Sequence, residues 1–145
     1  MDGDDFEIAD FLPYMLNRAA EATGQGFSRH YKDRYGMLRT EWRVLFHLGR
    51  YGPMTASAIC ARADLHKTKV SRAVAALESR RHVAREVQEE DRRNATLCLT
   101  RSGAAIYADL TEEARRYDDR LAARLTREEA RILRSCLARL AERGT

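Results

Sequence analysis

The sequence predicts a mainly α-helical protein that contains one small β-hairpin. Hydrophobic residues recur at intervals of three and four through most of the chain, which is the period of a helix with one apolar face. After Arg81 the period changes, and short alternating strands are expected around Val83 and Leu97. A basic helix followed directly by a charged hairpin is typical of a winged helix-turn-helix.

Length and composition are those of a small folded protein. The chain has 145 residues, of which 44% are hydrophobic, and its two prolines and eight glycines argue against disorder. No segment approaches the run of about 20 apolar residues that crosses a membrane. The N-terminal stretch MDGDDFEIAD is acidic where a secretion signal would be basic, so a cytoplasmic protein is expected.

Two helices are expected before the basic segment. The first runs from about Asp10, its cap, to about Tyr35, and Pro13 falls in its first turn, where a missing N–H does little harm. The second begins at Thr40 as its cap and ends at the Gly49 to Pro53 breaker. The apolar stripe of the first helix comprises Ile8, Phe11, Leu12, Met15, Leu16, Ala19, Ala22 and Phe27.

A short third helix begins at Thr55, ends near Asp64 and is expected to turn Ala58, Ile59 and Ala61 inward. The fourth helix lies within residues 63–81 and has two distinct faces. Its apolar stripe is Val70, Ala73, Val74 and Leu77. Cations, hydroxyls and one small side chain are left to face outward: His66, Lys67, Thr68, Lys69, Ser71, Arg72 and Ala75. Such side chains can reach phosphates and base edges in a DNA groove.

The hairpin is expected to have a long, charged connection from about Gln88 to Ala95. This connection carries Arg92 and Arg93, and arginines beside a groove-binding helix are suited to the neighbouring minor groove or backbone. An ordinary exposed polar loop is the alternative interpretation.

The C-terminal third is expected to be helical again. One helix runs from about Ser102 to Arg124, and a capping box between Thr126 and Glu129 begins the last. The expected inward positions of the first of these helices are Ala105, Ile106, Ala108, Leu110, Tyr117 and Leu121. Those of the last helix are Ala130, Ile132, Leu133, Cys136, Leu137 and Leu140.

Charge is distributed in a way that favours DNA as the partner. Residues 38–100 carry 12 Lys and Arg against 7 Asp and Glu, whereas the remaining residues carry 14 against 15. A basic central unit of this kind is expected to bind phosphates, although solvated arginine-rich helices would give a similar count.

Three segments follow from these patterns: an N-terminal dimerisation helix (1–37), a winged helix-turn-helix (38–100) and C-terminal dimerisation helices (101–145). The terminal helices have too little core of their own, so we expect them to pack against a second copy in a two-fold homodimer. Two copies would present two helices to half-sites one turn apart, which predicts a pseudo-palindromic operator.

The chain resembles the MarR family of bacterial transcriptional regulators over nearly its whole length. The resemblance covers LPYMLNRA, RTEWRVLFHL, the segment GPMTASAICARADLHKTKVSRAVAALESRRHVAR and the wing DRRNATLCLTRSG. Its most specific part is D-x-R followed by L-T-x-x-G, matched by Asp91, Arg93, Leu99, Thr100 and Gly103. The resemblance implies a homodimeric DNA-binding repressor or activator, in many relatives released from DNA by a small ligand.

The resemblance also implies residue roles. Thr68, Lys69, Ser71 and Arg72 would face the major groove. Arg93 would enter the minor groove, and Asp91 would hold the wing through a nearby arginine. The chain departs from the family where Arg81-His82 replaces a glycine and an aliphatic residue after the basic helix, so a differently shaped helix exit is expected, and Arg81 could add a phosphate contact.

A small aromatic effector is a further expectation from the resemblance. Tyr14, Trp42, Arg43, Phe46 and His47, with Phe11 and Met15, could line a cleft between the dimerisation helices and the winged region, although Trp42 and Phe46 could equally be plain core.

Redox, metal and enzymatic functions receive little support from the sequence. The three cysteines, Cys60, Cys98 and Cys136, are widely spaced and expected to be reduced thiols, with a thiol-based redox-responsive regulator using Cys60 kept as an alternative. The four histidines have no ligand spacing, so neither a metal nor a cofactor is expected. No nucleophile–base pair or phosphate loop indicates an enzyme. A winged-helix protein-interaction module is the second alternative, which steep salt dependence of duplex binding would exclude.

Overall fold

The computed structural model describes residues 5–88 and 91–142, and of residues 88 and 91–94 it describes the backbone alone. The chain forms two compact units, Met1–Thr111 and Glu112–Thr145. The long helix α5 (Arg101–Ala122) begins in the first unit and ends in the second. The boundary between these two units, after Thr111, differs from the boundaries of the three segments predicted from the sequence, which were 1–37, 38–100 and 101–145.

Helix α1 (Leu12–Tyr35) confirms the predicted N-terminal helix, but the predicted cap is wrong. Asp10 belongs to a short 3-10 turn, η1 (Ile8–Asp10), in which its N–H donates to the Glu7 carbonyl at 3.0 Å, and Phe11 is the N-cap. Of the predicted apolar stripe only Phe27 is buried, and the apolar residues in the first turns of α1 are exposed.

Helix α2 (Arg39–Tyr51) begins two residues earlier than predicted, so the predicted cap at Thr40 is wrong. Leu38 is the N-cap, and its N–H donates to Oε2 of Glu41 at 2.6 Å. The Glu41 carboxylate therefore satisfies an otherwise unpaired donor at the start of the helix, without a Thr hydroxyl. The helix ends at Gly52, within the predicted breaker.

Helix α3 (Ala56–Ala63) begins one residue after the predicted start at Thr55, which is its N-cap: the Thr55 hydroxyl accepts from the Ala58 N–H at 3.1 Å. Its inward face is narrower than predicted. Only Ile59 is buried, and Ala58 and Ala61 are exposed. A helix of two turns has room for a single line of contact with its neighbours, which the large Ile59 side chain takes.

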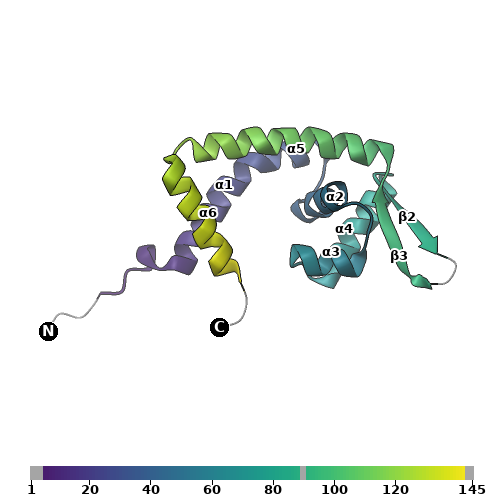
Figure 1. Cartoon of the computed structure of the whole chain (residues 1–145), viewed down its shortest axis with the longest axis horizontal. Helices are drawn as coiled ribbons and strands as arrows, with labels where there is room; N and C mark the ends of the chain where they lie inside the picture. Colours follow the sequence, from purple (N-terminus) through teal and green to yellow (C-terminus); the bar gives the residue numbers. More distant parts are fainter. Residues whose placement is uncertain (1–4, 89–90, 143–145) are drawn as a thin grey trace. The chain divides into compact units, whose positions relative to one another are not determined.

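Helix α4 (Lys67–Ser79) separates its two faces as predicted: Val70, Ala73, Val74 and Leu77 are all buried. It packs against α2 and α3 beside the β-hairpin (Figure 1). The core of this region also takes Met37, Leu45, Ile59 and Leu97, each at most 1% exposed. The exposed face of α4 thus rests on a closed hydrophobic core.

The sheet has three antiparallel strands in the order β1-β3-β2: β1 (Met54–Thr55), β2 (Val83–Gln88) and β3 (Asp91–Leu99). Strand β1 was not predicted, because two residues show no periodicity. The predicted Gln88 to Ala95 connection is wrong, since Gln88 pairs with Asp91 after an irregularity at Glu86. Residues 91–95 are mostly polar, so they lack the hydrophobic alternation by which a strand is predicted.

Helix α5 buries Gly103, Ile106 and Leu110, whereas the predicted inward positions Ala105 and Ala108 are exposed. The absence of a side chain at Gly103 is required by close packing. A Cβ there would lie 2.0 Å from the carbonyl oxygen of His82, a backbone atom that cannot move aside.

In the second unit, α6 (Arg127–Ala141) begins at the predicted capping box. The Thr126 hydroxyl accepts from the Glu129 N–H at 3.1 Å, and a Glu129 carboxylate oxygen accepts from the Thr126 N–H at 2.9 Å. Ala130 is the one buried residue of α6 in the single chain. The other predicted inward residues are exposed or half-buried: Ile132, Leu133, Cys136, Leu137 and Leu140. Among the residues described, no helix has both the length and the apolar composition to span a membrane.

Candidate nucleic-acid interface

The outward face of α4 carries the side chains that the sequence assigned to it. All seven are exposed: His66, Lys67, Thr68, Lys69, Ser71, Arg72 and Ala75. Because the opposite face of the same helix is fully buried, the orientation of these side chains is held by the core beneath them. The structure thus brings the predicted groove-facing residues of α4 together on one surface.

The turn between α3 and α4 positions the start of this helix. Asp64 adopts a left-handed conformation with φ of 52°, and the Leu65 N–H donates to the Cys60 carbonyl at 3.1 Å. His66 is the N-cap of α4, where its Nδ1 accepts from the Thr68 N–H at 3.2 Å. One ring nitrogen of His66 is therefore used to begin the helix, which leaves Nε2 as the atom that could contact DNA.

The charge of α4 is favourable for an anionic partner. Lys67, Lys69 and Arg72 are exposed in its first two turns. The one acidic residue of the helix, Glu78, lies near its C-terminal end and pairs with Arg85 of β2 at 2.8 Å. The N-terminal half of α4 therefore has no acidic side chain of its own that would repel a phosphate.

The wing is described only in part. The backbone of Asp91, Arg92 and Arg93 lies in strand β3, next to its pairing with Gln88. The side chains of these three residues lie outside the described part of the structure. Their predicted roles at the wing tip therefore stay predictions.

The exit of α4 has a left-handed backbone conformation, which glycine adopts most easily. Arg81 has φ of 62°, and its carbonyl accepts from the hydroxyls of Thr100 at 2.7 Å and Ser102 at 3.1 Å. These two hydrogen bonds hold an unfavourable left-handed arginine in place.

His82 follows this exit and contacts the Ser102 hydroxyl through Nδ1 at 3.0 Å. Desolvation by burial and, secondarily, the nearby positive charge of Arg80 lower the pKa of His82 below its ordinary value. The neutral imidazole is thus the form that the folded chain favours.

The predicted effector cleft is only partly assembled. Trp42 and Arg43 line a cavity of about 620 Å³ between α1 and α2, a size typical of small-molecule sites. The cavity also has aromatic walls from Phe27 and Tyr31 and a second cation, Arg39. Trp42 stacks on Tyr31 with ring centroids 5.9 Å apart. The pairs Phe27/Tyr31 and Arg39/Arg43 were not predicted as cleft residues, although each pair is spaced by four residues on one helix face.

The other predicted cleft residues lie elsewhere. Tyr14 lines a separate hollow of about 330 Å³ on α1, with Arg18 over its ring. Phe46 packs against Tyr107 with centroids 5.8 Å apart, and Nδ1 of His47 contacts the Arg43 carbonyl at 2.6 Å. None of these three side chains lines the cavity beside Trp42.

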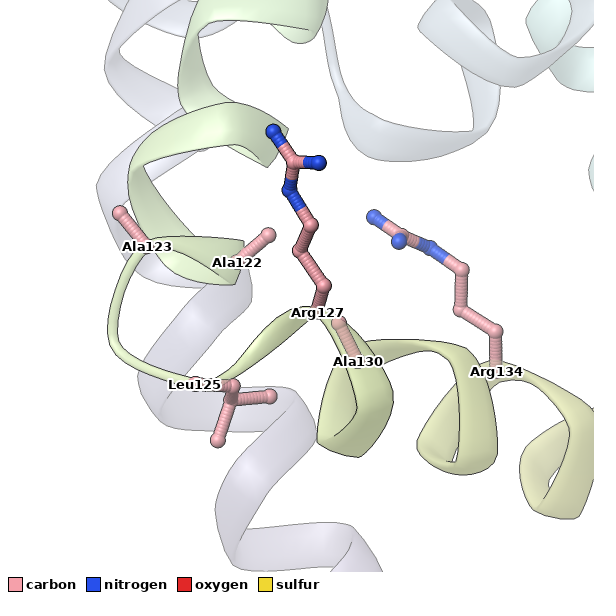
Figure 2. Close-up of a pocket in the computed structure, with 6 residues that line it drawn as sticks. All are labelled: Ala122, Ala123, Leu125, Arg127, Ala130 and Arg134. Atoms are coloured by element: carbon pink, nitrogen blue, oxygen red, sulfur yellow. The ribbon is translucent and has the colours of Figure 1, made fainter.

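A further hollow of about 320 Å³ lies in the second unit, where α5 meets α6. Figure 2 shows the side chains of Arg127 and Arg134 extending to the same side of α6. Arg134 pairs with Asp118 at 2.8 Å, and the remaining walls are Ala122, Ala123, Leu125 and Ala130. Without an aromatic wall, this hollow is less suited to an aromatic ligand than the cavity beside Trp42.

The cysteines Cys60, Cys98 and Cys136 are free thiols, each partly exposed. Within the described part of the chain, no group of three His, Cys, Asp or Glu residues is arranged to hold a metal ion.

Three comparisons with known proteins bear on this surface. A sequence model of the MarR family matches residues 35–94. The uncharacterised HTH-type transcriptional regulator YwoH of Bacillus subtilis is 27% identical over 112 residues, which are 77% of this chain and 80% of YwoH.

Two solved structures are similar over almost the whole chain. A MarR family regulator from Neisseria meningitidis is 25% identical, with a TM-score of 0.73 over 94% of this chain and 92% of that one. BpsR of Bordetella bronchiseptica, whose DNA binding is regulated by 6-hydroxynicotinic acid, has the same fold at 17% identity. Its TM-score is 0.86 over 96% of this chain and 99% of that one. With the helix-turn-helix and its exposed basic face, these matches lead to one conclusion: residues 35–94 match the MarR family, and the chain as a whole is similar in fold and sequence to winged helix-turn-helix, DNA-binding transcriptional regulators of that family.

Proposed function

We propose that the protein is a sequence-specific repressor that binds a pseudo-palindromic operator as a homodimer. The observation that carries this proposal is the two-faced helix α4, whose basic and hydroxyl side chains are exposed while Val70, Val74 and Leu77 are buried. A rigidly supported helix of this kind fits a major groove. Occupation of the operator would then block transcription.

Each exposed residue has a role suited to its chemistry. Lys67, Lys69 and Arg72 would contact phosphates or guanine, while Thr68 and Ser71 would hydrogen-bond to base edges or phosphates. On the wing, Arg92 and Arg93 would reach the minor groove, and Asp91 would orient a guanidinium group.

The homodimer is supported by the apolar faces that the single chain leaves uncovered. On α1, Leu12 is 59% exposed, and on α6, Leu140 is 57% exposed. Further exposed apolar residues of these helices are Phe11, Met15, Leu16, Ile132, Leu133 and Leu137. Apolar side chains in such number on two helices are expected to be covered by a partner, and a second copy is the partner that a palindromic operator requires.

Selection of duplexes from a random-sequence pool tests DNA binding directly. We expect the wild-type protein to enrich a palindrome with half-sites about one helical turn apart. Arg72→Ala and Arg93→Ala should each weaken binding to that duplex in a salt-matched gel shift, with little loss of fold.

Arg116→Ala is the matched control, because Arg116 is an exposed arginine paired with Glu112 and Glu113 on α5. It should leave affinity unchanged. Enrichment of a single half-site would contradict the homodimer, and unchanged affinity of Arg93→Ala would contradict the wing assignment.

Release from DNA by a small aromatic acid is the second part of the proposal. The cavity beside Trp42 offers aromatic walls for a ring and the cations Arg39 and Arg43 for a carboxylate. The regulation of BpsR by 6-hydroxynicotinic acid supports a ligand of this class.

The single tryptophan, Trp42, reports directly on this cavity. Titration with benzoate and with 6-hydroxynicotinate should quench its fluorescence, and Arg43→Gln should weaken the response. Arg50→Gln, which changes an arginine of the same helix that does not line the cavity, is the control. Equal responses of the two variants would contradict a carboxylate contact at Arg43.

A further inference from the structure

Arg80 lies at the C-terminal end of α4, and its side chain extends to the C-terminal end of α1. Its own N–H closes α4 by donating to the Ala76 carbonyl at 3.1 Å. Its Nη1 donates to the Gly36 carbonyl at 2.8 Å and to the Tyr35 carbonyl at 3.4 Å. The guanidinium group thus satisfies carbonyls at the C-terminal end of α1, where a helix favours positive charge.

The same guanidinium group faces a buried carboxylate. Nη1 of Arg80 lies 3.9 Å from Oε1 of Glu41, whose side chain is only 4% exposed. The other oxygen of Glu41 accepts from the Leu38 N–H at the start of α2. A buried carboxylate is stable only when charged or polar groups compensate its negative charge. Glu41 therefore restricts the positions that the Arg80 guanidinium group can take.

The C-terminal turn of α1 is held on a second side by α5. Arg34 donates to Asp109 at 3.0 Å, and the Tyr35 hydroxyl donates to the same carboxylate oxygen. Burial and the hydrogen bond with Asp109 raise the pKa of Tyr35, so its hydroxyl keeps its proton and stays a donor. The turn ends at Gly36, whose φ of 64° is a conformation that favours glycine.

These contacts make one continuous connection from α5 through the end of α1 to the end of α4. Helix α4 is held by its core face, which fixes its distance from α2. The Arg80 contacts restrain the position of its C-terminal end as well, so that a helix lying in a groove would meet the DNA at one defined angle.

We propose that Arg80 is a positioning residue for DNA binding, which sets the orientation of α4 by tying its end to the Tyr35 and Gly36 carbonyls and to buried Glu41. The inference rests on the proposed function. It assigns to Arg80 a role through protein contacts, in contrast to the exposed cations of α4, which would touch DNA themselves. It also makes the end of α1 the place where a change in α1 or α5 would alter DNA binding.

The test compares variants on the duplex that the wild-type protein enriches from a random pool. Arg80→Ala should weaken binding about tenfold, within the range by which residues that touch neither ligand alter coupling. The slope of log Kd against log salt should stay unchanged, because no phosphate contact is lost. Loss of a phosphate contact would reduce that slope by about one.

Glu41→Gln distinguishes a positioning role of Arg80 from a general electrostatic effect, because the two predict changes in DNA affinity of opposite sign. Removing a negative charge should strengthen the attraction of the protein for DNA, whereas a lost tie to Arg80 should weaken binding by about threefold. Glutamine keeps an oxygen that can accept from the Leu38 N–H. The double variant of Arg80→Ala with Glu41→Gln should bind no more weakly than Arg80→Ala alone, because both changes remove one interaction.

Arg116→Ala is the matched control, since it removes the same charge from an exposed arginine that pairs with Glu112 and Glu113 on α5. It should lower affinity less than Arg80→Ala does. Thermal melting by circular dichroism checks that each variant is folded at the assay temperature. If Arg80→Ala does not fold, Arg80→Lys and Glu41→Gln carry the test, and each should weaken binding at an unchanged salt slope.

Three outcomes would overturn the inference: unchanged affinity of the folded Arg80 variants, a salt slope reduced by about one, or tighter binding of Glu41→Gln. Failure of the proposed function is a different result, in which the wild-type protein enriches no duplex at all.

Discussion

The winged helix-turn-helix and the terminal helices bury their apolar faces to very different degrees. Leu45, Leu77 and Leu97 in the winged region are at most 1% exposed, whereas Leu12 of α1 and Leu140 of α6 are more than half exposed. Both regions show amphipathic helices in the sequence. An amphipathic pattern therefore identifies an apolar face of a helix but does not indicate what covers that face.

The largest expected effect comes from opening the closed core. Leu77→Ala should lower the free energy of unfolding by about 2–5 kcal/mol, because a fully buried leucine loses its contacts and leaves a cavity. Leu133→Ala on α6, where the side chain is 46% exposed, should cost less in dilute solution. Urea unfolding at low protein concentration measures both. Equal losses would remove the distinction between the two regions.

The open faces are tested by introducing charge. Leu133→Asp combined with Leu137→Asp should give a monomer in sedimentation velocity, since burying two carboxylates in an apolar interface is costly. Affinity for a duplex with two half-sites should fall about a hundredfold, because the second half-site loses its effective concentration. Ser135→Asp places a similar charge at an exposed position of the same helix and should leave the assembly intact. A dimer that survives the double change would show that α6 is not part of the interface.

A smaller loss of stability is expected from a substitution at the junction between the hairpin and α5. Gly103→Ala should destabilise the protein by about 1–3 kcal/mol, the usual cost of overpacking, because its Cβ would overlap the His82 carbonyl oxygen. Ala105→Ser, at an exposed position of α5, is the comparison. A Gly103→Ala protein as stable as wild type in urea would contradict the close approach.

The smallest expected effect is on the pH dependence of stability. The folded chain lowers the pKa of His82, so folding favours the neutral imidazole and the unfolded state binds more protons. Stability from His82 is therefore complete above the ordinary pKa of about 6.5 and declines as the pH falls below it. His82→Gln should flatten the decline in urea unfolding between about pH 7 and pH 5. An unchanged profile would exclude His82 as its source.

Much of the fold could be predicted from the sequence because its elements have strong local signals. The helix starts near Thr55 and at the Thr126 capping box, and the apolar stripe of α4, lie where the sequence predicted them. The incorrect start of α2 and the missed strand β1 have the same cause. The start of α2 depends on the Glu41 carboxylate reaching Leu38, and strand β1 depends on pairing with Leu97 and Thr96 of β3. Neither interaction has a local pattern.

The residues of the candidate site could likewise be predicted from the sequence only in part. The exposed residues of α4 could be predicted because one helix carries all of them. The cavity beside Trp42 could not, because its walls come from two helices, and only packing brings Phe27 and Tyr31 to Arg43. Of the predicted cleft residues, Tyr14, Phe46 and His47 therefore lie away from it.

By itself, the sequence determined the helices, the basic face of α4 and the resemblance to the MarR family, since periodicity, caps and charge are properties of neighbouring residues. Only the tertiary structure decided that Arg80 ends α4 against the Tyr35 and Gly36 carbonyls and buried Glu41. In the sequence, Arg80 is one of several arginines around the hairpin. Its role depends on contacts with residues about 40 positions away, which form only when the chain has folded.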